Sequence, residues 1–174
     1  IVDTIPCTQQ LIEVFGRTQG PVIAVNEIPP EKVGSYGIIQ GRPLDPSLYF
    51  VEDIVEKPRL EDAPSRIGVM GRYIFTPDIF QCLKEVQPGF GGEIQLTDAI
   101  KHLSGRRPVY ASFFSGKRYD TGDRLGYVQA IIDFALTHEE IGDEVREYLQ
   151  LVAGEKLPLT SGTAVNHRKS ISRP

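Results

Sequence analysis

Apolar positions along the chain follow the spacing of helices and strands in alternation. Over residues 8–18, Leu11, Ile12 and Phe15 fall on one face of a helix, and the apolar run over 21–25 is typical of a buried strand. The same pattern predicts a strand that starts at Gly37, further strands over 49–56, 67–75 and 109–114, and helices over 76–86, 96–103, 125–136 and 141–152.

One of these helices has a particularly clear start, at Thr76-Pro77-Asp78. A hydroxyl suits the N-cap position, Pro suits the first helical position, and an acid in the first turn is favoured by the helix dipole. We therefore expect Thr76 to cap this helix.

The alternation of strands and helices predicts the fold class. Such a sequence builds an α/β domain in which helices cover a parallel or mixed sheet, with ligands bound beyond the carboxyl ends of the strands. The length of 174 residues suits a single domain. The polar end of the chain, residues 158–174, is predicted to be a disordered tail.

Composition limits the classes of function. With 40% hydrophobic and 24% charged residues the chain is globular, and a net charge of -4 disfavours nucleic-acid and anionic membrane partners. Cys7 and Cys82 lack metal or disulfide spacing, which predicts free thiols in a reducing compartment. No apolar run approaches the roughly 20 residues that a membrane helix needs. These features predict a soluble, cytoplasmic protein.

Glu56-Lys57-Pro58 ends a predicted strand with two charged side chains. Pro58 cannot donate to a sheet and favours an extended Lys57, so Glu56 and Lys57 should face opposite ways and not pair. One side chain could hold the hydroxyl groups of a ligand while the other binds an anion. The alternative is a solvated strand end.

Tyr119-Asp120-Thr121-Gly122-Asp123 precedes the predicted helix over residues 125–136. Asp120 could be a Mg²⁺ ligand, because Mg²⁺ takes one or two carboxylates together with substrate phosphate oxygens. The alternative is local: Thr121 or Asp123 caps the helix and Asp120 forms an Asx turn. Lys117 and Arg118 could neutralise a phosphate or only solvate a turn.

Three further positions fit either a ligand site or ordinary backbone geometry. Glu93, in the loop that enters the helix over 96–103, could reach a ligand, whereas Thr97 beside it could serve only as a cap. Gly37 and Gly71 lie in strand-like segments, where glycine permits close approach of a ligand or marks a bulge.

The order of these motifs carries more information than each motif alone. Ser-Tyr-Gly-Ile-Ile, Val-Glu-Lys-Pro, Val-Met-Gly-Arg-Tyr, Gly-Glu-Ile-Gln-Leu-Thr-Asp-Ala and Tyr-Asp-Thr-Gly-Asp follow one another over residues 1–157. This series closely resembles the bacterial UTP–glucose-1-phosphate uridylyltransferases (UDP-glucose pyrophosphorylases). The resemblance implies a Rossmann-like nucleotidyltransferase fold, a layered mixed sheet with flanking helices. It also implies that residues 1–157 are the C-terminal, sugar-phosphate-binding part, without the nucleotide-binding half.

The resemblance also assigns roles to individual residues. It implies that Gly37 and Glu56 contact the glucose hydroxyls, that Lys57 is catalytic and binds the sugar phosphate, and that Gly71 lines the sugar pocket. Asp120 would act in catalysis as a Mg²⁺ ligand.

Two further residues, Lys117 and Glu93, would contact substrate. The Gly-rich triphosphate loop of the family and the strand end with its second metal ligand are not found in this sequence.

For the intact enzyme the resemblance implies Mg²⁺-dependent transfer of UMP from UTP to glucose 1-phosphate, giving UDP-glucose and pyrophosphate. It further implies a homo-oligomer, and a 174-residue chain that is inactive by itself. Two alternatives stay open at this point. One is a non-catalytic module for sugar-phosphate binding or oligomerisation, and the other is a thymidylyl-transferring relative.

Overall fold

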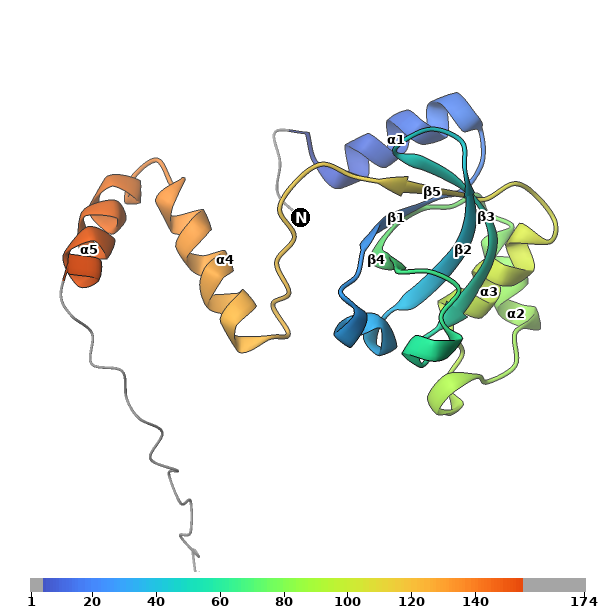
Figure 1. Cartoon of the computed structure of the whole chain (residues 1–174). Helices are drawn as coiled ribbons and strands as arrows, with labels where there is room; N and C mark the ends of the chain where they lie inside the picture. Colours follow the sequence, from blue (N-terminus) through green and yellow to red (C-terminus); the bar gives the residue numbers. More distant parts are fainter. Residues whose placement is uncertain (1–4, 155–174) are drawn as a thin grey trace, which may run out of the picture. The chain divides into compact units, whose positions relative to one another are not determined.

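The computed structural model describes residues 5–154, which divide into two compact units (Figure 1). The first unit ends at Arg118 and the second begins at Tyr119. The tail predicted over residues 158–174 lies outside the described residues.

The first unit is built on a mixed sheet of five strands. They are β1 (Val22–Glu27), β2 (Gly37–Pro43), β3 (Leu48–Glu56), β4 (Ile67–Ile74) and β5 (Tyr110–Phe113). The strands follow the order β1-β4-β2-β3-β5 and close into a barrel, because β5 pairs with β1 in parallel and with β3 antiparallel. The predicted mixed sheet is confirmed, and its closure is a feature that the sequence pattern did not predict.

Helical segments flank this sheet. They are α1 (Cys7–Thr18), η1 (Pro30–Ser35), η2 (Leu60–Asp62), α2 (Ile79–Glu85), η3 (Phe90–Gly92) and α3 (Leu96–Ser104). Helix α1 packs on β1 and β4, α3 packs on β3, and α2 packs on α3 (Figure 1). The helices predicted over 8–18 and 96–103 are thus confirmed to within one residue at each end.

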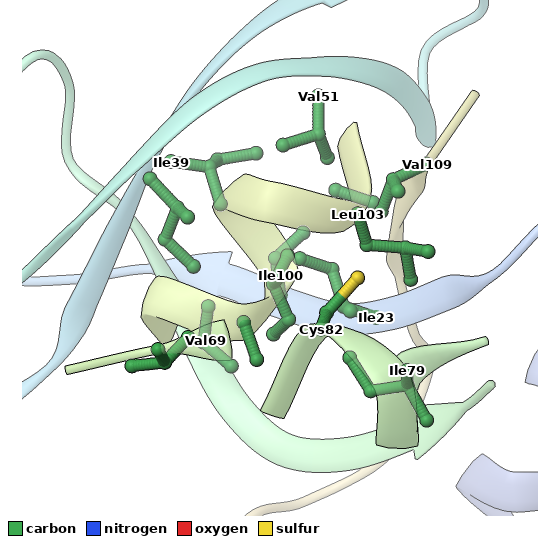
Figure 2. Close-up of a cluster of buried hydrophobic side chains, with 14 residues drawn as sticks. Ile23, Ile39, Val51, Val69, Ile79, Cys82, Ile100, Leu103 and Val109 are labelled. Carbon is green, nitrogen blue, oxygen red and sulfur yellow. The ribbon is translucent and has the colours of Figure 1, made fainter. Parts of the chain in front are cut away.

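Alternation along β1 divides the apolar side chains between two cores. Ile23 and Val25 belong to the core beneath α2 and α3, whereas Val22 and Ala24 belong to the core beneath α1. Figure 2 shows the first of these cores, in which residues of β1 to β4 meet Cys82 of α2 and Ile100 of α3. Successive strand residues point to opposite faces of a sheet, so β1 supplies both cores at once.

The start of α2 differs from the prediction. The α-helix begins at Ile79, and its N-cap position is Asp78, with no capping bond from a side chain. The hydroxyl of Thr76 instead contacts the Asp78 carboxylate and accepts a hydrogen bond of 3.0 Å from Arg107 Nη1. The prediction of Thr76 as the cap is therefore wrong, because the nearby cation competes for the hydroxyl.

The second unit contains α4 (Arg124–Leu136) and α5 (Gly142–Gly154). Asp123 caps α4, since its Oδ2 accepts a hydrogen bond of 2.8 Å from the Gly126 N–H. Of the two capping residues considered for this helix, Asp123 is confirmed. Within residues 5–154, none of the helices combines the length and apolar character needed to cross a bilayer.

We predict that Ile100→Ala, in the core of Figure 2, lowers the free energy of unfolding by about 2–5 kcal/mol, because it leaves a cavity where a buried side chain stood. Urea unfolding of the chain measures this loss. The matched control is Ile12→Ala, at a position on α1 that is 47% exposed. Equal losses in the two variants would contradict the assignment of this core.

Candidate functional site

Gly37 and Glu56 lie opposite each other at one end of the β2–β3 pair. A Cβ atom on residue 37 would stand 3.2 Å from Glu56 Oε2 and 2.7 Å from Thr97 Cγ2, so only glycine fits there without displacement. The Glu56 side chain is 15% exposed. The sequence-predicted residues Gly37 and Glu56 are thus brought together, and Thr97 joins them.

Lys57 departs from the strand geometry that was predicted for it. Its φ of 44° lies in the left-handed region, its N–H donates to the Tyr36 carbonyl at 3.0 Å, and its Nζ stands 3.4 Å from Glu56 Oε1. An extended Lys57 and an unpaired Glu56 are therefore both wrong. The alternation of side chains holds only within a strand, and β3 ends at Glu56.

The turn at Lys57 is also a strained one. A residue other than glycine at positive φ costs on the order of 1–3 kcal/mol, and such residues gather at functional sites. This turn holds the Lys57 ammonium beside the Glu56 carboxylate. The Lys57 side chain is 38% exposed, whereas the Glu56 side chain is mostly buried. This end of the sheet therefore offers a cation and hydrogen-bond acceptors within one short segment.

Thr97 is a functional candidate that the sequence reasoning treated only as a possible cap. Helix α3 has Gln95 at its N-cap without a side-chain capping bond, so Thr97 does not cap it. Thr97 is 7% exposed, and across the described part of the chain its Oγ1 finds no hydrogen-bond partner. A buried hydroxyl without a partner is costly and suits a site for a polar ligand. The motif Gly-Glu-Ile-Gln-Leu-Thr-Asp-Ala was the available signal.

Tyr73 of β4 is the second residue that the sequence reasoning missed. Burial, and then the negative charge of Glu56, raise the pKa of Tyr73 above its ordinary value. The Tyr73 ring stacks on Phe75, with 5.2 Å between the ring centroids. Strand β4 thus contributes a phenol that responds to the Glu56 charge.

Gly71 lies on an irregular part of β4. The register passes from Ile23↔Tyr73 to Val25↔Val69, so β4 carries two extra residues between these pairs, and Gly71 there has a φ of 68°. The bulge that was one alternative for this glycine is therefore present. A Cβ at residue 71 would meet nothing within 4 Å, and the role of Gly71 in lining a sugar pocket stays a prediction.

Glu93 and Lys117 are both exposed, and neither lies within one of the helices or strands given above. Glu93 follows η3, where Gly91 and Gly92 have φ values of 70° and 76°, and its carbonyl accepts a hydrogen bond of 2.9 Å from the Gly89 N–H. Lys117 follows β5 near the end of the first unit. Their predicted substrate contacts stay predictions.

Asp120 belongs to the second unit. Its Oδ1 accepts a hydrogen bond of 3.2 Å from the Gly122 N–H, which is the Asx turn considered as the alternative to a metal ligand. Within residues 5–154, no three His, Cys, Asp or Glu side chains are grouped as a metal centre would require. One carboxylate can still contribute to a site for an ion that takes most of its oxygen ligands from substrate and water, as Mg²⁺ does.

Comparison with known proteins shows the family of this chain. The profile of the nucleotidyl transferase family matches residues 8–136, which include Gly37, the Glu56-Lys57 turn and Asp120. The chain belongs to the nucleotidyl transferase family. The family was expected from the order of the motifs, and that expectation is confirmed.

Two curated relatives carry the same name, UTP–glucose-1-phosphate uridylyltransferase. The protein of Streptococcus pneumoniae serotype 4 is 46% identical over 147 residues, and that of Streptococcus pyogenes is 44% identical over 146 residues. Each match covers 83% of this chain, but only 49% and 48% of the two relatives. The chain therefore spans about half the length of the curated relatives it matches.

Solved structures of UDP-glucose pyrophosphorylases are also similar. One, in complex with UDP-glucose, is 38% identical with a TM-score of 0.71, and the match covers 87% of this chain and 52% of that one. Another, from Acinetobacter baumannii, is 31% identical with a TM-score of 0.70, and the coverages are 83% and 50%. The expected nucleotidyltransferase fold is confirmed by this likeness.

We predict that Gly37→Ala lowers the free energy of unfolding by about 1–3 kcal/mol, the usual cost of overpacking, because its Cβ meets Thr97 and Glu56. Thr97→Ser removes the nearer atom, so Gly37→Ala should cost less in that background. Urea unfolding of the four proteins in this cycle measures the coupling.

The matched control is Gly16→Ala, at a position in α1 where a Cβ meets nothing within 4 Å. Alanine should stabilise the helix there by roughly 0.5–1 kcal/mol. A cost for Gly37→Ala that is the same with and without the Thr97→Ser substitution would count against the packing described.

We further predict that Glu56→Gln lowers the pKa of Tyr73, because the substitution removes a negative charge that disfavours the phenolate. The pKa should stay above its ordinary value, since burial of the ring persists. Titration of the ring resonances of Tyr73 by NMR measures the change, and Glu61→Gln is the control at an exposed glutamate. An unchanged or higher pKa of Tyr73 in the Glu56→Gln variant would contradict the placement of Glu56 near Tyr73.

Proposed function

We propose that this chain forms the glucose 1-phosphate-binding part of a UTP–glucose-1-phosphate uridylyltransferase. The carrying observation is the strained turn at Glu56-Lys57, which holds a carboxylate and an ammonium 3.4 Å apart beside Gly37. A sugar phosphate presents the two matching chemistries, neutral hydroxyl groups and an anion. The names of the relatives support the same substrate.

The two side chains of the turn would bind different ends of the substrate, the sugar and the phosphate. Glu56 would accept hydrogen bonds from glucose hydroxyls, since an ionised carboxylate is a strong acceptor. Gly37 would leave room for the sugar next to that carboxylate, and the Thr97 hydroxyl, which lacks a partner across the described residues, would bind a further hydroxyl of the sugar. Lys57 would bind the phosphate. Gly71, Glu93 and Lys117 would complete the set of contacts.

The reaction that we propose is a displacement at phosphorus. A phosphate oxygen of glucose 1-phosphate attacks the α-phosphorus of UTP in line, and a new P–O bond forms as the bond to the β-phosphate oxygen breaks. UDP-glucose and pyrophosphate result, and the electron pair of the broken bond leaves with pyrophosphate. Such a reaction needs alignment and charge neutralisation more than it needs a protein nucleophile. Lys57 would align the attacking phosphate and neutralise part of its charge.

A divalent cation, which we take to be Mg²⁺, would be held in part by Asp120. The Asp120 carboxylate provides the oxygen chemistry that this ion prefers, although Oδ1 already accepts from the Gly122 N–H. When bound, the ion would neutralise charge on the phosphate groups.

We take residues 1–157 to work together as the sugar-phosphate part, in the cytoplasm and in a homo-oligomer. Cys7 and Cys82 support a reducing compartment, since both are buried free thiols. Burial also raises the pKa of the Cys7 thiol, which keeps it in its unreactive protonated form.

We predict that the 174-residue chain binds glucose 1-phosphate and that Lys57→Ala weakens this binding about 10-fold or more, the usual effect of losing a charge-assisted hydrogen bond. Isothermal titration calorimetry measures the affinity. Lys101→Ala is the matched control, because Lys101 is a half-exposed lysine that pairs with Asp53 on another part of β3. Equal affinities of wild type and Lys57→Ala would refute the role of Lys57.

Transfer itself is tested in the natural protein, by measuring pyrophosphate release from UTP and glucose 1-phosphate. Release that depends on both substrates and falls on the order of 10²-fold in Lys57→Ala would support the uridylyltransferase. Binding of glucose 1-phosphate without any release would favour the non-catalytic module instead.

A further inference from the structure

Arg118 makes two contacts with the side chain of Tyr36. Its Nη1 donates to Tyr36 Oη at 2.9 Å, and its Cζ lies 5.2 Å from the centroid of the Tyr36 ring. Both residues are half-buried, and the Tyr36 ring packs against the core beneath α1. The ring is therefore held by a guanidinium and by an apolar core.

The backbone of Tyr36 in turn holds Lys57. The Tyr36 carbonyl accepts the Lys57 N–H at 3.0 Å, just before Gly37 pairs with Glu56. Lys57 needs such a bond, because its φ of 44° is disfavoured and the following Pro58 restricts its backbone further. The position of the Lys57 ammonium depends on this backbone.

We propose that Arg118 is a positioning residue for Lys57 and acts through Tyr36. By fixing the Tyr36 ring, Arg118 fixes the carbonyl that keeps Lys57 in its left-handed turn. Arginine suits this task better than lysine, because its planar guanidinium can cover an aromatic ring and donate a hydrogen bond in a defined direction. The importance of this role for catalysis rests on the proposed function, but the linkage itself does not.

The experiment measures hydrogen exchange at the Lys57 amide in the ¹⁵N-labelled 174-residue chain. Arg118→Lys should speed exchange at Lys57 about 5-fold or more, the effect of weakening one hydrogen bond, while amides within the β2–β3 ladder keep their rates. General loosening of the fold would speed the ladder amides as well, so the selectivity separates positioning from a merely structural role. Tyr36→Phe removes only the hydroxyl and should give a smaller change in the same direction.

Arg146→Lys is the control, since Arg146 is a half-exposed arginine on α5 that pairs with Asp143. Unchanged exchange at Lys57 in both Arg118→Lys and Tyr36→Phe would overturn the proposal, as would equal acceleration across the ladder. In the same variants the affinity for glucose 1-phosphate should fall about 3-fold or more. A wild-type chain that binds no glucose 1-phosphate would contradict the proposed function, while the exchange rates would still decide the role of Arg118.

Discussion

The pairing of Gly37 with Glu56 is the interaction on which the site depends. It fixes the end of β3, and the chain then turns at Lys57 through a conformation that the Tyr36 carbonyl stabilises. Without the side-chain space left by Gly37, neither the Glu56 carboxylate nor Thr97 could occupy its place. One register pair therefore determines where the Lys57 ammonium, the Glu56 carboxylate and the Thr97 side chain lie.

The core beneath α2 and α3 connects Thr97 and Gly37 to the rest of the first unit. Ala99 and Ile100, which follow Thr97 in α3, are fully buried in this core together with Ile54 of β3. The same packing that stabilises the fold thus presses Thr97 against Gly37. Rigid placement of this kind is what a site needs when its chemistry relies on alignment.

Much of this arrangement could be predicted from local sequence, and the exceptions have physical causes. Periodicity identified α1 and α3, and the residues before an apolar stripe limited the cap of α4 to Thr121 or Asp123, of which Asp123 is the one that serves. The left-handed turn at Lys57 depends on a bond to a residue 21 positions earlier, which no local pattern contains. Thr76 failed as a cap for a similar reason, since Arg107 competes for its hydroxyl.

The closed order of the strands has a consequence for association. In the first unit every strand already has a neighbour on each side, so the described sheet has no terminal strand. A terminal strand is where a foreign strand can add through main-chain bonds, and that route underlies much β-type aggregation. Where its strands are paired on both sides in this way, the unit offers a companion its side chains and not its main chain.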